Sequence, residues 1–440
     1  MKAAAAGGGG ARMAAWRLHA YGGAGELRLE AARVPPLRAP DELLVRVHAA
    51  GLNPLDAAMT RGYGARALAA LRALDGGARL ELPLVCGREF LGTVERAGPA
   101  ARLRRGARVW GVVPPHRAGA HAQYAVRCAL QAGEAPRALS DAECGGAPYA
   151  ALTASAALRA AGAVRRALVL GLGGVGQAAV QLLAARGAHV TVGCAAEQAP
   201  LALELGAARA LDRRAPDYDA QLRDAEESRS RLEFCSVLEC AGLGGAHAAD
   251  AAARGVRFAR FVTLSSPLLR ETDARGLSAG AAAAAGALLA HSWRAAAAAG
   301  GPAAPACTPL VRWAFFRPRA SDLEDVRRLA ERGRVSYLPT SSQSAGSRLV
   351  ACNVRCMFAA AVPRGGGARV PVVGGRRGVR ARGRGRRARQ AGAGLDARGP
   401  ARAPRVPGAR ARARARAPVT ALLPCTSCCL VLSRPIFSNK

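Results

Sequence analysis

Aromatic residues, acidic residues and long apolar runs are all scarce in this chain of 440 residues. Only 4% of the residues are aromatic, and the longest apolar stretch, residues 279–290, is dominated by alanine and too short to cross a bilayer. We therefore expect a soluble protein. Half of the residues are hydrophobic, so the chain is long enough and apolar enough for two or more domains with sizeable cores.

The shortage of acids is greatest in the last hundred residues. Residues 340–440 contain 21 Lys and Arg but only one acid, Asp396. Their sequence is rich in Arg/Gly and Ala/Arg repeats and lacks a periodic spacing of apolar residues. Such a segment cannot bury enough apolar surface to offset chain entropy, so we expect a disordered basic tail. Only Phe358 and Phe437 could stack on bases there, which favours accidental attraction to polyanions over a specific nucleic-acid function, despite the net charge of +34.

Most of the 12 cysteines are isolated, as is typical of reduced intracellular thiols. Two denser groups lie in the basic tail: Cys352 with Cys356, and Cys425 with Cys428 and Cys429. No histidine lies near either group, so a zinc site is the less favoured interpretation.

The most informative segment is a predicted strand-to-helix junction at residues 167–176. It contains Gly171, Gly173 and Gly176 at GxGxxG spacing, followed by a helical stretch and a second strand at 189–193. Gly171 would allow a tight turn, Gly173 the approach of a pyrophosphate, and Gly176 close packing of helix on strand. With Gly174 and Val175 at the helix start, free N–H groups would meet the phosphates. This βαβ context favours dinucleotide binding over an ordinary Ala/Gly-rich turn.

No carboxylate follows the second strand, where an acidic residue would bind the adenosine ribose. The residues there are Cys194, Ala195 and Ala196. A 2′-phosphate is therefore not repelled, and Arg213 with Arg214 could supply positive charge, which favours NADPH. That these arginines belong to a solvated surface remains the alternative.

The region before this unit is β-rich. Short predicted strands at residues 14–19, 42–48, 92–97, 107–113 and 123–127 are separated by Gly/Pro turns, and a predicted helix at 148–161 follows.

Residues 42–56 (ELLVRVHAAGLNPLD), 87–90 (GREF) and 148–154 (PYAALTA) resemble the quinone oxidoreductase branch of the medium-chain dehydrogenase/reductase superfamily. Within that branch, residues 61–65, 113–119 and 311–316 resemble a mitochondrial group that interacts with reticulons. The resemblance covers about residues 13–338.

The resemblance implies an α/β fold with a disordered N-terminus at residues 1–12, a GroES-like catalytic domain at 13–147 and a Rossmann domain with a doubly wound parallel sheet at 148–338. It also implies NADPH as cofactor, a quinone or related activated carbonyl as substrate, and a link to coenzyme Q biosynthesis. A reticulon-type membrane protein as partner, a homo-oligomer and a mitochondrial location are further implications, with the cytoplasm as the alternative.

Zinc-dependent members of this superfamily have a histidine directly before the Glu of the second motif, and here that position is Arg88. The first domain offers no set of soft ligands at usable spacing, so we expect a zinc-independent reaction. A quinone or activated enone suits this expectation because it is already electrophilic.

The resemblance also assigns site residues. Ala195 and Arg213 stand where the family has a serine and a tyrosine that contact the 2′-phosphate, and Cys240 replaces a cofactor-contacting asparagine. Leu264 and Phe316 match positions that line the nicotinamide side, although core packing explains them equally well.

On the substrate side, the resemblance places Asn53, Asp56 and Tyr63 where the cleft opens. Tyr63, on a loop expected to be flexible, could donate a hydrogen bond to the reacting carbonyl. An aromatic lid over the cofactor is the equally favoured alternative.

The resemblance ends abruptly. A predicted helix at residues 322–332, capped by Ser321, leads to a strand beginning at Arg334, and the family's closing helix and strands have no counterpart after residue 338. We therefore expect an unpaired edge in the first domain. Three interpretations stay open: a working reductase, a non-catalytic scaffold that binds a partner, and a defective isoform with an aberrant C-terminus.

Overall fold

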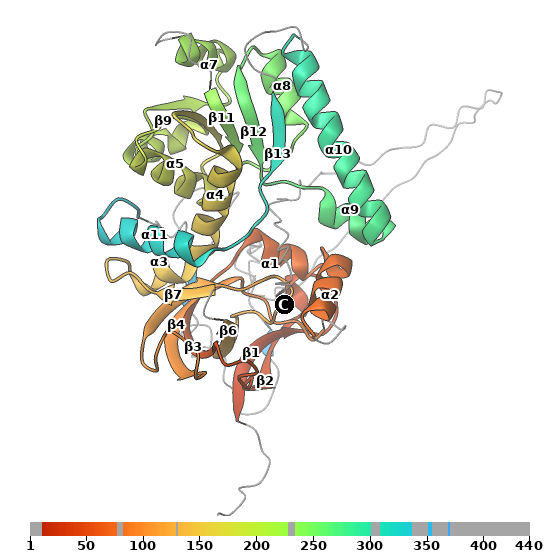
Figure 1. Ribbon diagram of the computed structural model, residues 1–440, viewed down its shortest axis with the longest axis vertical. Coiled ribbons are helices and arrows are strands. Elements are labelled where there is room, and N and C mark those ends of the chain that lie inside the picture. Colours follow the sequence, from red (N-terminus) through yellow and green to blue (C-terminus); the bar gives the residue numbers. More distant parts are fainter. Residues whose placement is uncertain are drawn as a thin grey trace, which may run out of the picture. The chain divides into compact units, whose positions relative to one another are not determined.

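The computed structural model describes residues 11–76, 82–128, 131–227, 234–300, 309–336, 351–353 and 368–369. The first domain is built on antiparallel strands in which β3 pairs with β4 and β4 with β5 (Figure 1). Strand β3 is ten residues long and almost entirely buried, as expected for the centre of a sheet. The elements of this domain are β1 (Arg12–Leu18), β2 (Leu27–Arg33), β3 (Glu42–Gly51), α1 (Pro54–Met59), α2 (Ala65–Leu74), β4 (Glu89–Ala97), β5 (Arg108–Val112), β6 (Tyr124–Cys128), β7 (Ala132–Glu134) and α3 (Asp141–Gly146).

The second domain contains a six-stranded parallel sheet in the order β10-β9-β8-β11-β12-β13. The order reverses between β8 and β11, which pair in register from Ser236 with Ala167 to Glu239 with Leu170. In open parallel sheets, ligands bind outside the carboxyl ends of the strands at such a reversal. The strands are β8 (Arg166–Leu170), β9 (His189–Cys194), β10 (Arg209–Asp212), β11 (Phe234–Glu239), β12 (Phe258–Thr263) and β13 (Leu310–Trp313).

Helices cover both faces of this sheet. Figure 1 shows α4 and α5 on one side and α8 and α10 on the other, each side with its own buried cluster of side chains. This is the doubly wound arrangement expected from the sequence. The helices are α4 (Pro148–Ala161), α5 (Gly174–Ala185), α6 (Ala199–Glu204), α7 (Tyr218–Glu227), α8 (His247–Ala253), α9 (Leu268–Arg275), α10 (Leu277–Ala298) and α11 (Ala320–Glu331).

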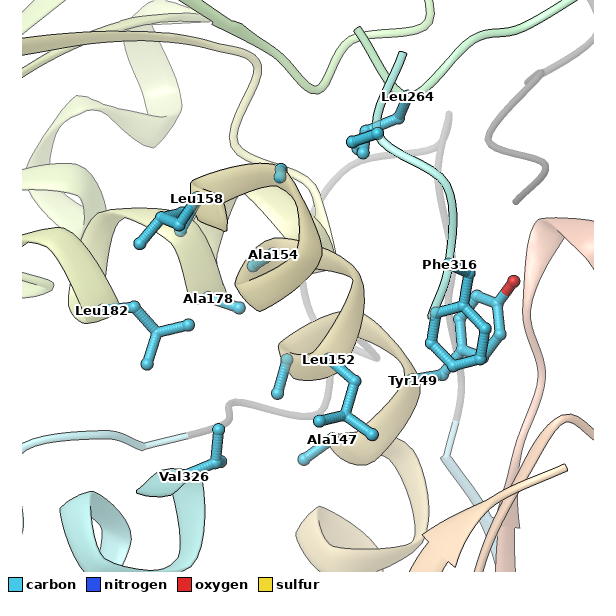
Figure 2. Close-up of a cluster of buried hydrophobic side chains, with 14 of the residues drawn as sticks. Ala147, Tyr149, Leu152, Ala154, Leu158, Ala178, Leu182, Leu264, Phe316 and Val326 are labelled. Carbon is cyan, nitrogen blue, oxygen red and sulfur yellow. The ribbon is translucent and has the colours of Figure 1, made fainter. Parts of the chain in front are cut away.

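Helix α4 lies in a hydrophobic cluster that both domains share. The cluster includes Leu55 and Leu91 of the first domain and Leu182 and Leu264 of the second, and Figure 2 shows the side chains around α4. Alanine and leucine dominate this helix, so its neighbours can pack closely against it on more than one side.

Two local predictions near the end of the second domain are wrong. Helix α11 begins at Ala320 with Arg319 as its N-cap, so Ser321 lies inside the helix and caps nothing. Residues 334–336 form no strand, because Arg334 folds back through its N–H onto the Leu329 carbonyl, 2.9 Å away, and so closes the helix end. Gly333 does end the helix, with a φ of 64°.

The tail contributes two short described strands to the first domain. Strand β14 (Ala351–Asn353) pairs antiparallel with residues 49–51 of β3, and β15 (Ala368–Arg369) pairs with β2. The expected unpaired edge is therefore occupied at β3, since backbone pairing needs no particular side chains. The remaining expectations for residues 340–440, for residues 1–10 and for the two cysteine groups lie otherwise outside the described residues. Among the described helices, none is both long and apolar enough to cross a membrane.

Candidate active site

The glycine loop after β8 has the geometry predicted for dinucleotide binding. Gly171 has a φ of 94°, which strongly favours glycine, and a Cβ on Gly176 would lie only 2.0 Å from the Gly171 carbonyl oxygen. In contrast, a Cβ on Gly173 would meet nothing within 4 Å. The first and third glycines are thus required by the fold, whereas the second borders open space into which a phosphate can come.

Helix α5 begins directly after this loop with Gly173 as its N-cap. No side chain caps the helix, and Gly174 and Val175 provide its first N–H groups. Uncapped N–H groups at a helix start, together with the helix dipole, attract a phosphate.

At the end of β9, where the ribose is expected, Arg213 lies close to Cys194. The Arg213 N–H donates to the Cys194 carbonyl at 2.9 Å, and Arg213 is exposed without an ion-pair partner among the described residues. Asp212, opposite Cys194 in the strand register, was not considered from the sequence, and its carboxylate accepts from the Arg214 N–H at 3.0 Å. Ala195 is half-buried and offers no polar side chain.

Sequence analysis missed Tyr218 at this end of the sheet. Its side chain is 8% exposed, and its hydroxyl has no hydrogen-bond partner within the described part of the chain. A Cβ on Gly193 would lie 2.5 Å from that hydroxyl and 3.3 Å from Cγ of Arg213, so Tyr218 points to the end of β9 beside Arg213. Burial raises the pKa of Tyr218 to about 12, so the hydroxyl keeps its proton and can donate.

A buried carboxylate organises the loop after β11. Glu239 accepts hydrogen bonds from the N–H groups of Ala241, Leu243 and Gly244 at 2.8, 2.9 and 3.1 Å, and from the Thr263 hydroxyl at 2.7 Å. No motif identified this residue. Burial raises the pKa of the adjacent Cys240 thiol, so Cys240 is a neutral thiol rather than a thiolate.

The two residues expected at the nicotinamide, Leu264 and Phe316, follow the ends of β12 and β13. Leu264 and Phe316 are both buried in the shared cluster, and the Phe316 ring stacks on Tyr149 of α4 with centroids 4.5 Å apart (Figure 2). Both residues are thus core residues, and their predicted contact with the cofactor stays a prediction. The neighbouring Ser265 has a buried hydroxyl that lacks a hydrogen-bond partner among the described residues.

On the first domain's side, Asn53 and Asp56 are buried rather than free in a cleft. Asn53 is the N-cap of α1, and its Nδ2 donates to Glu89 at 2.8 Å. Asp56 accepts from the N–H groups of Asn53 at 3.0 Å and of Gly87 at 2.7 Å, and Glu89 accepts from the Tyr149 N–H at 2.9 Å. Burial raises the pKa of Glu89 to about 8.

Arg88 is fully buried beside this network. Its Nε lies 3.5 Å from Asp56 Oδ1, and its terminal nitrogens donate to four backbone carbonyls at 3.0 to 3.1 Å, those of Val85, Pro114, Pro115 and Arg117. The guanidinium thus fixes the loop at residues 114–117. Among the described residues, no three His, Cys, Asp or Glu side chains gather as a metal site.

Tyr63 lies on a compact turn, not on the flexible loop expected from its flanking glycines. Gly62 and Gly64 have φ angles of 84° and 77°, and Gly62 N–H donates to the Met59 carbonyl and Ala65 N–H to that of Gly62. The Tyr63 side chain packs against the shared cluster that contains Leu264 and Phe316. The two predicted catalytic residues thus lie at opposite ends of α1, Asn53 at its N-cap and Tyr63 after its last turn.

Comparison with known proteins supports this architecture. Residues 39–165 match the alcohol dehydrogenase GroES-like domain. A quinone oxidoreductase structure from Coxiella burnetii has the same fold, with a TM-score of 0.53 at 19% identity, covering 74% of this chain and 90% of that one.

The mitochondrial NAD(P)H oxidoreductase RTN4IP1 of Drosophila melanogaster is 35% identical, over 75% of this chain and 80% of its own length. This chain belongs to the RTN4IP1 family. The human RTN4IP1 protein is 30% identical over 73% of this chain and 81% of its own. The resemblance to the medium-chain dehydrogenase/reductase superfamily is thereby confirmed. As a member of the RTN4IP1 family, the chain is a mitochondrial oxidoreductase that uses a nicotinamide cofactor.

Proposed function

We propose that this chain transfers a hydride from NADPH to a quinone or a similarly activated carbonyl without the help of a metal ion. The observation that carries the proposal is the fully buried Arg88 guanidinium, held by four backbone carbonyls at the position where the resemblance implies a zinc ligand. A fixed cation repels a metal ion at that position, and a quinone needs no Lewis acid because it accepts a hydride readily. A link to coenzyme Q chemistry fits this substrate class.

The residues at the carboxyl ends of the parallel strands fit a dinucleotide with a 2′-phosphate. Open space at Gly173, the uncapped start of α5 and the unpartnered hydroxyls of Tyr218 and Ser265 all lie at carboxyl ends of the strands. Arg213 supplies a cation at the ribose end, and Tyr218 a hydroxyl donor. Together they favour NADPH over NADH.

When bound, the reduced nicotinamide supplies the hydride. The stacked rings of Phe316 and Tyr149 provide apolar surface on the side where the nicotinamide is expected. Tyr63 either donates a hydrogen bond to the carbonyl oxygen as it gains charge or covers the cofactor as a lid. A Y63F variant separates these roles, because a lid keeps its function without the hydroxyl.

The test is NADPH-dependent reduction of menadione, a naphthoquinone, by the purified chain, with and without a chelator and with elemental analysis. We expect chelator-resistant turnover, no stoichiometric zinc and a lower dissociation constant for NADPH than for NADH. Chelator-sensitive turnover, or equal affinities for the two cofactors, contradicts the proposal.

We also propose that a reticulon-type membrane protein is a partner and that the chain forms a homo-oligomer. A relative from Caenorhabditis elegans carries the name reticulon-4-interacting protein 1. Light scattering after size exclusion tests the oligomer, and titration of a reticulon cytosolic segment tests the partner. A monomeric mass and no saturable binding are the contrary results.

A further inference from the structure

A carboxylate of the second domain caps a helix of the first. Asp273 of α9 accepts a hydrogen bond from the Gly64 N–H at 2.6 Å through Oδ2 and another from the Arg66 N–H at 3.1 Å through Oδ1. Gly64 is the N-cap of α2, and the two partners are 209 and 207 residues away from Asp273 in the sequence. Helices α9 and α2 are in contact.

Helix α2 needs this outside partner because its own N-cap has no side chain. Gly64 adopts a left-handed conformation with a φ of 77°, and no side chain within the helix's own start accepts from its first N–H groups. A carboxylate stabilises a helix start both by accepting N–H bonds and by its interaction with the helix dipole.

The same contact has an apolar part. Leu269 of α9 is 4% exposed, and a Cβ built on Gly64 would lie 3.2 Å from its Cδ1. The other acid of α9, Glu271, pairs with Arg270 and Arg275 of the same helix. Of the two acids on α9, Asp273 is therefore the one that binds the first domain.

We propose that Asp273 is a positioning residue that latches α9 to the start of α2 and thereby fixes the turn that carries Tyr63. Tyr63 directly precedes Gly64, so its backbone is restrained while both Gly64 and Arg66 are held by one carboxylate. This inference rests on the proposed function for its kinetic test, but its geometry stands independently.

The test compares D273A with E271A, which removes the same charge from the same helix without breaking a contact to α2. We expect D273A to raise KM for menadione about fivefold and to lower kcat. A fivefold change in an equilibrium constant corresponds to the free energy of one lost helix cap. The dissociation constant for NADPH should stay within about twofold, because Asp273 lies away from the glycine loop. Hydrogen exchange at the Gly64 and Arg66 amides should become faster in D273A alone, and D273N, which keeps one acceptor oxygen, should restore part of each effect.

Two outcomes overturn the latch. In the first, D273A has the KM, kcat and amide exchange of E271A, even if it is less stable. In the second, D273A lowers kcat further by the same factor in a Y63A background, which lacks both the ring and the hydroxyl of Tyr63, so that Asp273 does not act through Tyr63. If the wild-type chain reduces no quinone, the proposed function fails, while faster exchange at Gly64 and Arg66 in D273A still supports the latch and unchanged exchange refutes it.

Discussion

Two sets of polar groups in the candidate site, one in each domain, differ in how they are paired. In the second domain, the hydroxyls of Tyr218 and Ser265 and the start of α5 lack partners among the described residues. In the first domain, Asp56 and Glu89 accept hydrogen bonds from backbone N–H groups, and Arg88 donates to backbone carbonyls. Because unsatisfied buried groups are costly, the first set indicates a place kept for a ligand, whereas the second set is an internal scaffold.

The largest effect is expected when the Arg88 side chain is replaced. R88M leaves Asp56 without its cation and four carbonyls without their donor, so the free energy of unfolding should fall by about 3–5 kcal/mol. Urea denaturation measures it. R213A is the matched control on the ligand side, and its stability should be unchanged; equal losses in both variants would abolish the distinction between scaffold and ligand site.

The second test uses pH. An unfolded chain releases the Glu89 proton near pH 4.5, and the folded protein near pH 8, because burial raises the pKa. Between these values the folded state holds more protons, so the free energy of unfolding should fall as the pH rises, by up to about 1.4 kcal/mol per pH unit from this group. E89Q should lose this slope, and the control E95Q, at a half-buried glutamate, should keep it; an identical slope in wild type and E89Q would assign the proton to another group.

The third test concerns the ribose end of the crevice. R213A should weaken NADPH binding about tenfold, as expected for the loss of one charged hydrogen bond, and should leave NADH binding unchanged. Titration of cofactor fluorescence gives both constants. Loss of both affinities to the same extent would mean that Arg213 supports the fold rather than the phosphate.

The smallest effect is expected from the two unpartnered hydroxyls. Y218F should weaken NADPH binding about threefold and S265A should weaken the binding of both cofactors similarly, without loss of stability, because neither hydroxyl has a partner among the described residues. Thr191 of β9 also has a buried hydroxyl with no partner in the described part of the chain, but it lies before the end of its strand, so T191V is the control. If T191V weakened cofactor binding as well, the losses would come from disturbed strand packing rather than from the hydroxyls of Tyr218 and Ser265.

The sequence predicts what depends on neighbouring residues. The three glycines and their flanking strand and helix predicted the loop, and the short β-rich segments predicted the first domain, since turns and periodicity are local signals. The sequence also shows that no acid follows β9. It does not show that Asp212 of the adjacent strand lies opposite Cys194, because strand pairing brings the two residues together.

The contacts that complete the site are long-range. Arg88 binds carbonyls 26 to 29 residues away, and Asp273 binds the Gly64 N–H over 209 residues. The Tyr218 hydroxyl lies near Gly193 only because α7 packs beside the end of β9. No spacing rule identifies such partners in one sequence. The pairing of β14 and β15 with the first domain was missed for a similar reason, since backbone hydrogen bonds do not depend on composition.

Helix α4 has a consequence for how the molecule comes apart. Eleven of its 14 residues are buried, and seven of them belong to a cluster to which both domains contribute. Neither domain can lose its structure without exposing the apolar surface of the other, so the two should melt as one cooperative unit. A calorimetric scan should give one transition, and a fragment cut between residues 147 and 148 should aggregate rather than fold by itself.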